Sequence, residues 1–414
     1  MVHTLCIFED QEYTQLLPLA YLRPTWDLRC GIVTLREKIE RTFPGMTIQF
    51  LCRGYLADLV REQHPERTVN ASLSGDVLFI NGRVLADADI ARELAALSAD
   101  TLCVSGSAVV AARLSAQSIQ QLRFDSSQLP DFSGLRHLPH REFTETLIRY
   151  PWDLVNNNGR QIIADFESSI AHGAAARQGT VYPGSHLLNP DAIAIGTASS
   201  IKPGVVLDAE NGPIVIGKNV RILPNAVIEG PASIGDGSLI KVGAKIYEHT
   251  SIGPVCKVGG EVEASIIHGY SNKQHDGFLG HAYLCPWVNL GADTNNSDLK
   301  NNYGSVRVKI NGKEIDSGSL FAGVIVGDHA KSAINTMFNT GTVVGVGSNV
   351  FGGGFPPKYI PSFSWGGAEG MTTYDIEKCV AVARTVMERR KKPLTAAEEH
   401  VLRMVFTMTA HERT

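Results

Sequence analysis

The sequence predicts three parts: an α/β domain, a parallel β-helix and a short helical cap. Strands alternate with helical stretches before residue 170, aliphatic residues then recur every six positions, and two helices are predicted beyond Pro361. The 414 residues suffice for two or three domains, because a domain averages roughly 150 residues. We expect the α/β domain at 1–155, the β-helix at 156–366 and the cap at 367–414.

The α/β domain is predicted from short apolar runs and helical patterns. Because strands alternate with helices, a parallel sheet is favoured. The segment 150–158 (YPWDLVNNN) is interpreted as a linker to the next part. The predicted strands are 6–8, 47–51, 77–80 and 102–104, and the predicted helices are 35–42, 56–63, 90–97 and 116–122.

The six-residue repeat predicts the β-helix. A period of six is neither the helical 3.6 nor a simple alternation, so it indicates short strands joined by corners. The forty glycines often follow the repeated aliphatic residue or lie near corners, where the backbone turns sharply. A glycine-rich β-sandwich with accidental spacing is the alternative. The repeated residues are Ile195, Ile201, Leu207, Ile216, Ile222, Ile228, Ile234, Ile240, Ile246, Ile252 and Val258.

Two interruptions of the repeat matter for function. From Val258 to Leu284 the spacing is two residues more than four hexads, so residues 264–283 are expected to leave the coil as a loop. Residues 306–315 alternate around Asn-Gly and predict a hairpin. The repeat is expected to resume at Leu284, Leu290, Leu320, Val326, Ser332, Phe338, Val344 and Val350.

The C-terminal region predicts two helices, 374–391 and 396–410, separated by Pro393. Thr395 and Glu398 form a capping box for the second helix. We expect both helices to cover the open end of the β-helix, which otherwise exposes unpaired strand edges.

Composition excludes several classes of function. The net charge is −4 and no long Lys/Arg run is present, so neither a nucleic acid nor a membrane surface is expected as a partner. No apolar stretch reaches membrane-spanning length, and Glu9 and Asp10 interrupt the first apolar run too early for a signal peptide. Seven scattered cysteines without a CxxC pair are typical of a cytoplasmic protein.

Three motifs carry a resemblance to a known family. They are Ser271–His281 (SNKQHDGFLGH), Asn289–Ala292 (NLGA) and Asn301–Tyr303 (NNY). With the order of the predicted domains, they resemble the bifunctional N-acetylglucosamine-1-phosphate uridyltransferase/glucosamine-1-phosphate acetyltransferase family, and its shortened branch of sugar nucleotidyltransferases in particular. The resemblance implies a left-handed β-helix of hexapeptide repeats, a shortened nucleotidyltransferase-like domain and a homotrimer. It also implies sugar phosphate, nucleoside triphosphate and acetyl-CoA as substrates, in nucleotide-sugar biosynthesis.

The resemblance assigns His275 as the general base that takes a proton from the sugar amine. Imidazole suits this task because it is substantially neutral near pH 7. Asn302 and Tyr303 match the family's pair near the acyl-CoA and sugar, and Lys273 lies two residues before the base rather than three. Glu263 stands where the family has a phosphate-binding lysine, and Phe278 where it has tyrosine.

Glu263 would repel a phosphate and prefer an amine or a hydroxyl, so the acceptor sugar is left open. Lys300, Arg307 and Lys331 are candidates for binding the phosphates of coenzyme A; as solvated side chains they would have no such role.

In the N-terminal part, the family's glycine-rich phosphate loop is absent. Arg23, Arg29 and Lys38 could grip phosphates instead. Alternatively, the two arginines pair with Asp27 and Glu37 to fix a turn.

Nucleotidyl transfer uses Mg²⁺, and Asn81 follows the strand 77–80 where the family has its metal-binding aspartate. Three alternatives therefore stay open. The β-helix alone could be catalytic beside a degenerate N-terminal domain, or the chain could be a trimeric non-catalytic scaffold. His268, His275 and His281 could instead bind zinc.

Overall fold

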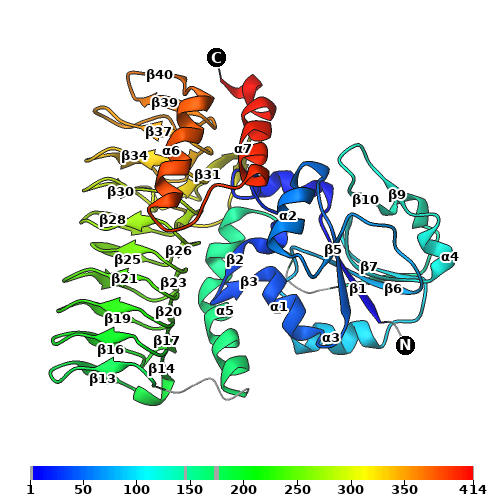
Figure 1. Ribbon diagram of the computed structural model, residues 1–414, viewed down its shortest axis with the longest axis horizontal. Coiled ribbons are helices and arrows are strands. Elements are labelled where there is room, and N and C mark those ends of the chain that lie inside the picture. Colours follow the sequence, from blue (N-terminus) through cyan, green and yellow to red (C-terminus); the bar gives the residue numbers. More distant parts are fainter. Residues whose placement is uncertain (1–2, 144–146, 172–176, 414) are drawn as a thin grey trace.

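The computed structural model describes residues 3–143, 147–171 and 177–413. Figure 1 shows the β-helix as a stack of strands on one side and the α/β domain on the other, with the long helix α5 upright between them. The C-terminal helices α6 and α7 lie near the upper coils. The predicted fold class is confirmed.

The α/β domain is built on a seven-stranded sheet in the order β11-β7-β8-β6-β1-β4-β5. β1 pairs parallel with β4 and β6, as predicted, but β8 runs antiparallel to β6 and β7. The sheet is therefore mixed, because β7 and β8 form a hairpin whose turn contains Gly106 at a positive φ of 62°. The strands are β1 Thr4–Phe8, β4 Thr47–Leu51, β5 Thr68–Val69, β6 Val77–Asn81, β7 Thr101–Ser105, β8 Ala108–Leu114 and β11 His140–Glu142.

Four helices accompany this sheet: α1 Leu35–Thr42, α2 Ala57–Gln63, α3 Ala88–Ala95 and α4 Ala116–Ile119. The capping box of α1 shows why it begins where it does: the Thr34 side chain accepts from the Glu37 backbone, and the Glu37 carboxylate accepts from the Thr34 backbone. A small hairpin, β2 (Arg29–Cys30) and β3 (Val33–Thr34), precedes α1.

The β-helix has three parallel sheets along its sides. One contains β12 Thr180–Val181, β15 Ser200–Ile201, β18 Arg221–Ile222, β21 Leu239–Ile240, β24 Lys257–Val258 and β27 Asn272–Lys273. The second contains β13 His186–Leu188, β16 Val206–Asp208, β19 Val227–Glu229, β22 Lys245–Ile246, β25 Glu261–Glu263 and β28 Phe278–Gly280. The third contains β14 Ile193–Ile195, β17 Ile214–Ile216, β20 Ala232–Ile234, β23 Thr250–Ile252, β26 Ile266–Ile267, β29 Tyr283–Leu284, β33 Ile325–Val326, β36 Val343–Val344 and β38 Tyr359–Ile360.

The upper coils continue with β30 Asn295–Asn296 paired to β35 Met337–Phe338, and with β34 Lys331–Ser332, β37 Asn349–Val350, β39 Ser364–Gly367 and β40 Gly370–Thr373. β40 runs antiparallel to β39 and ends that sheet. The repeated aliphatic residues point inward and stack in register; Ile216, Ile234 and Ile252, for example, are fully or almost fully buried.

The prediction that residues 264–283 leave the coil is wrong. β26, β27 and β28 lie within this range and pair with the preceding coil. The coil keeps its path by shortening some corners, so the span from Val258 to Leu284 makes five sides, not four hexads and a loop. The inward residues along it are Val258, Val262, Ile267, Lys273, Leu279 and Leu284.

The predicted hairpin is confirmed as β31 (Arg307–Ile310) and β32 (Lys313–Asp316), with Gly312 at a φ of 76° in its turn. Val308 and Ile310 are buried, so one face of the hairpin packs on the core. Leu320 does not rejoin the repeat: it is 48% exposed and lies outside any strand.

The expected linker is helical instead, because α5 spans Pro151–Ala171. Asn158 on α5 accepts a hydrogen bond from the Gly31 backbone (2.7 Å) and another from the Ser251 hydroxyl (3.0 Å). Its Nδ2 donates to the His249 carbonyl at 2.7 Å. One buried amide therefore joins the helix, the α/β domain and the coil. The boundary proposed at 155/156 falls inside this helix.

The two predicted C-terminal helices are present as α6 (Ile376–Glu388) and α7 (Ala396–Met408), and the capping box of Thr395 and Glu398 is confirmed. They pack along the side of the coil rather than across its end. Arg390, just after α6, donates to the Val255 carbonyl and to Asn272. Side chains of both helices share a single core with the α/β domain and the outer face of the coil.

Candidate functional sites

The three cations predicted to hold nucleotide phosphates lie at the contact between the α/β domain and its neighbours. The Arg23 guanidinium forms a bidentate ion pair with Asp328, whose side chain is 2% exposed. Arg29 donates from Nε to the His268 carbonyl at 3.3 Å, and its backbone N–H donates to the Tyr283 hydroxyl at 2.9 Å. The alternative pairing of these arginines with Asp27 and Glu37 is absent from the ion pairs of the described chain.

Lys38 is also engaged by protein. Its Nζ donates to Asp165 of α5 at 2.6 Å, and the side chain is 3% exposed. Burial lowers the pKa of Lys38, and the neighbouring Asp165 carboxylate opposes that shift. A phosphate-binding role for Arg23, Arg29 and Lys38 stays a prediction.

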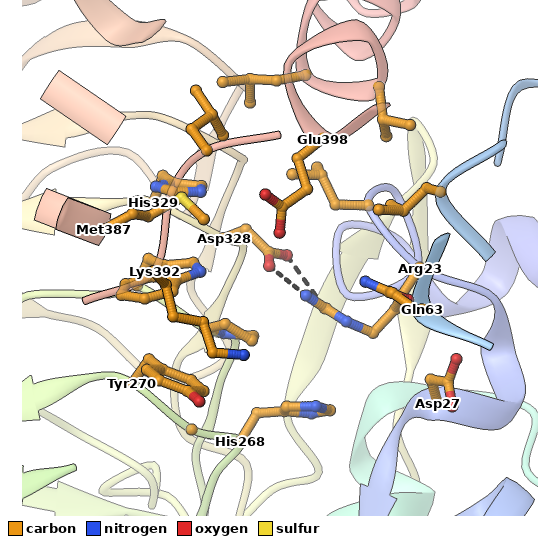
Figure 2. A pocket seen from close by; sticks show the side chains of 18 of the residues that line it. Arg23, Asp27, Gln63, His268, Tyr270, Asp328, His329, Met387, Lys392 and Glu398 are labelled. Carbon is orange, nitrogen blue, oxygen red and sulfur yellow. Dashed lines mark hydrogen bonds and ion pairs between the residues drawn. The ribbon is translucent and has the colours of Figure 1, made fainter. Parts of the chain in front are cut away.

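A cavity of about 390 Å³ lies between the α/β domain, the β-helix and the C-terminal helices, and Arg23 and Arg29 are among its lining residues. Its walls come from α2 and the segment after β1, from corners of the coil, and from the C-terminal helices. Figure 2 shows Arg23 paired with Asp328 at its edge, and Lys392 and Glu398 extending into it from the C-terminal part.

A second pocket, of about 630 Å³, lies at the carboxyl ends of the central strands, the usual ligand position in open α/β sheets. Asp10, Glu12, Asp125 and His140 line it. Arg83, fully buried behind it, donates to Glu12 at 2.9 Å and pairs closely with Asp10. The sequence analysis missed this arginine, although it stands just after the central strand.

On the coil, Lys273 occupies an inward position that the repeat gives to aliphatic residues. It is 2% exposed, and its Nζ donates to the Gly259 and His275 carbonyls at 3.1 and 2.7 Å. Burial lowers its pKa to about 8. The amine thus faces the coil interior, whereas the resemblance placed it at the substrate.

His275 lies on the corner just after this lysine and is exposed. Its backbone carbonyl is engaged, but no hydrogen bond from its ring is found within the described residues. Its role as general base stays a prediction.

A histidine–aspartate pair follows β28. His281 Nδ1 lies 2.8 Å from Asp298 Oδ2, and the two side chains are 18% and 13% exposed. The imidazole stacks on Phe321 with ring centroids 4.8 Å apart. Glu263 is close enough for its pKa to respond: burial raises it, the His281 charge lowers it, and Asp298 raises it further.

Sequence reasoning considered His281 only as a zinc ligand. The missed signal is spacing: Asp298 follows His281 by 17 residues, the same offset that joins Val262 to Leu279 in neighbouring coils. Residues one turn of the β-helix apart lie directly above one another, which brings His281 and Asp298 into contact.

Four of the remaining predicted residues lie between Leu290 and Leu320, where the repeat is interrupted, and the fifth, Lys331, begins β34. Asn302 and Tyr303 are exposed, Tyr303 by 69%. Lys300 donates to the Ser305 carbonyl, and Arg307 pairs with Glu314 across the hairpin at 3.3 Å. Lys331 donates to the His329 carbonyl at 2.9 Å, away from this surface. The structure therefore does not gather these five candidate residues around one point.

The three histidines of the zinc alternative also have separate surroundings. His268 is half-buried, with Nδ1 at 3.1 Å from the Tyr283 hydroxyl, while His281 is held by Asp298. Within the described ranges, no group of three or more histidine, cysteine, aspartate or glutamate side chains is placed to hold a metal ion. No helix in the described part of the chain is long and apolar enough to span a bilayer.

The fold defines a chain in which an α/β domain is joined to a β-helix of six-residue repeats. Residues 5–172 match the family model described as sugar nucleotidyl transferase, and residues 213–248 match the model for the bacterial transferase hexapeptide. The resemblance predicted from the sequence motifs is confirmed.

Two curated relatives match parts of this chain. The bifunctional sugar-1-phosphate nucleotidylyltransferase/acetyltransferase of Sulfurisphaera tokodaii is 30% identical over 149 residues, covering 33% of this chain and 37% of the relative. The bifunctional protein GlmU of Synechococcus elongatus is 27% identical over 206 residues, covering 45% of this chain and 42% of that protein. This chain thus spans about two fifths of the length of each relative.

Among solved structures, the UDP-N-acetylglucosamine acyltransferase of Francisella novicida is 17% identical with a TM-score of 0.27, covering 52% of this chain and 73% of that chain. The corresponding enzyme of Campylobacter jejuni is 10% identical with a TM-score of 0.21, covering 55% and 94%. Scores of this size do not establish a shared overall structure.

Proposed function

We propose that the chain is a sugar-phosphate transferase of nucleotide-sugar biosynthesis, whose coil transfers an acyl group from acetyl-CoA to a sugar amine or hydroxyl. The observation that carries the proposal is the His281–Asp298 pair on a coil that matches transferase hexapeptide repeats. The name of the Sulfurisphaera tokodaii relative, which combines nucleotidyl transfer with acetyl transfer, supports the same assignment.

The pair has the arrangement of a general base and its orienting carboxylate. An ionised Asp298 accepts a hydrogen bond from Nδ1–H of His281, which leaves the lone pair of Nε2 free. As the acceptor amine attacks the thioester carbonyl, Nε2 takes the amine proton and the C–S bond breaks. The proton then passes to the thiolate of coenzyme A, so the site is regenerated.

The surface beside the pair favours a cationic or neutral acceptor group over a phosphate. Glu263 lies in β25 of the second sheet, and Glu248, Glu229 and Asp208 lie on lower coils. Burial raises the pKa of Glu229, and the charges of Glu248, Asp208 and Glu263 raise it further. Carboxylates along one face repel a phosphate and attract an amine. The acceptor would therefore present its amino or hydroxyl group here.

The pocket at the carboxyl ends of the α/β sheet is assigned to the nucleotide and sugar phosphate. Arg136 and His140 at its rim could face phosphates. The residues described there do not form a carboxylate cluster for the Mg²⁺ that nucleotidyl transfer uses. Arg83 already forms ion pairs with Asp10 and Glu12, two carboxylates of this pocket. Acetyl transfer alone is therefore the second candidate function.

A cytoplasmic homotrimer is also part of the proposal. Val242 and Ile334 are 61% and 68% exposed, and each lies two residues after an inward residue of the same sheet, as His275 does. Exposed aliphatic residues at the same corner of two separate coils favour burial against another copy of the chain. His275 would then lie at the boundary between subunits.

The test measures coenzyme A release from acetyl-CoA with amino-sugar phosphates. His281→Asn is expected to lower kcat roughly 10²–10⁴-fold, and Asp298→Asn to lower it less. His275→Asn is the matched control, because it changes an exposed histidine on the preceding corner. Full activity in His281→Asn with loss in His275→Asn would transfer the base to His275 and overturn our assignment.

Nucleotidyl transfer is tested separately as pyrophosphate release from nucleoside triphosphates with sugar 1-phosphates, with and without Mg²⁺. Release that is lost in Arg83→Gln supports an active α/β domain. Acetyl transfer without any release would leave acetyl transfer as the sole activity.

A further inference from the structure

The interdomain cavity has a wall of three stacked rings. Tyr270, Trp287 and His329 lie on one corner of three successive coils, each three residues after an inward residue of the third sheet. The ring centroids of Tyr270 and Trp287 are 4.7 Å apart, and those of Trp287 and His329 are 6.1 Å apart. We call this the corner stack.

The corner stack occupies a backbone conformation that bulky residues rarely adopt. The φ angles are 54° at Tyr270, 66° at Trp287 and 58° at His329. The same corner carries Ala198, Asn219, Gly237 and Val255 in lower coils, also at positive φ. A bulky side chain in this conformation costs roughly 1–2 kcal/mol per residue. Strain of this kind clusters at functional sites.

The cavity contains polar groups without protein partners. Nδ1 of His329 is buried and has no hydrogen-bond partner within the described part of the chain, while the residue is only 5% exposed. A buried unsatisfied group costs about 1–3 kcal/mol, so this imidazole nitrogen is a costly feature of the cavity wall. The Glu398 carboxylate, which caps α7, also extends into the space.

The charges around the cavity leave an excess of one cation. Two arginines are neutralised: Arg23 by Asp328 and Arg36 by Asp27 at 2.8 Å. Two further cations of the lining, Arg29 and Lys392, take part in no ion pair among the described residues. Arg29 donates only to backbone carbonyls, and Lys392 lies over the Tyr270 ring at 5.1 Å. Glu398 is the one lining carboxylate outside an ion pair.

We propose that this cavity binds a phosphorylated sugar, with the phosphate held by Arg29 and Lys392 and the sugar ring against the corner stack. About 390 Å³ falls within the size range of small-molecule sites. The ring hydroxyls face the Glu398 carboxylate. Because the walls come from the α/β domain, the coil and the C-terminal helices, the ligand bridges all three parts. This site is separate from the coil surface around His281 and from the pocket beside Asp10.

The test is equilibrium binding without turnover, so it does not depend on the proposed activities. Glucose 1-phosphate is titrated into the full-length protein, followed by calorimetry and by tryptophan fluorescence, since Trp287 is in the wall. Lys392→Gln is expected to weaken binding at least about tenfold, the effect of losing one charge-assisted hydrogen bond. Lys391→Gln, which changes the adjacent exposed lysine, is the matched control and should bind as the wild type does.

Two further measurements complete the test. Trp287→Leu should weaken binding of glucose 1-phosphate and remove its fluorescence response, whereas His281→Asn should leave binding unchanged. Binding by Lys392→Gln equal to that of the wild type would overturn the proposal. Equal affinity for inorganic phosphate and glucose 1-phosphate would overturn the sugar site.

Discussion

Lowering the pH should destabilise the folded protein through one buried histidine, His329, where the β-helix meets the α/β domain and the C-terminal helices. Burial lowers the pKa of His329 to about 3, and the nearby charges of Lys331 and Arg23 act in the same direction. The Lys331 amine donates to the His329 carbonyl, and Trp287 covers the ring. No carboxylate compensates, so the folded protein holds this imidazole neutral.

The sign and size follow from linkage. The unfolded chain binds a proton at His329 below its ordinary pKa of about 6.5, while the folded chain does so only near 3. Between these values the unfolded state carries more protons, so stability falls as the pH falls. From about pH 7 to about pH 5 the loss at this single site is about 2 kcal/mol.

The assay compares the free energy of unfolding in urea at both pH values for three proteins. His329→Asn removes the titrating group and places a residue suited to the positive φ of 58° at that corner. The wild type should therefore lose about 2 kcal/mol more than His329→Asn on acidification. His400→Asn, which changes an exposed histidine on α7, should keep the wild-type dependence. An unchanged dependence in His329→Asn would refute the reasoning.

Three further predictions concern buried polar groups. The folded chain releases the Lys273 proton near pH 8 and the unfolded chain near 10.5. Relative to Lys273→Met, the wild type should therefore gain about 2 kcal/mol in free energy of unfolding between about pH 8 and pH 10. An equal pH dependence of the free energy of unfolding in urea for the two proteins would contradict this. Arg23→Met should destabilise the protein by about 3–5 kcal/mol by leaving Asp328 buried and unpaired, and the double variant with Asp328→Leu should recover most of that loss; no recovery would show that the cost lies elsewhere. Asn158→Ala should lower the free energy of unfolding by about 1–3 kcal/mol, measured against Asn157→Ala on the same helix.

The coil could be predicted because its periodicity is local. Inward aliphatic residues such as Ile222 and Ile240 stand in the same register in both sequence and structure. The hexad count failed where corners shorten, since a side of four or five residues cannot be told from a loop by spacing alone. Lys273 also obscured the continuation of the β-helix, because it stands at an inward position where the repeat normally has an aliphatic residue.

The contacts between distant segments could not be predicted. Arg23 is 305 residues from Asp328 in the sequence, and nothing local distinguishes an arginine that will pair across domains from one free to bind phosphate. The His281–Asp298 pair could have been predicted, because the spacing of the two residues equals one turn of the β-helix. The family resemblance assigned the general base to His275 instead.

The placement of α7 has a consequence for how the chain is made. Leu402 and Val405 of this last helix complete the same core that contains Leu59 and Val60 of α2, near the start of the chain. A ribosome synthesises those early residues long before the helix that covers them. The α/β domain therefore exposes this apolar face while the β-helix is being translated, and the face is covered only once α7 has been made.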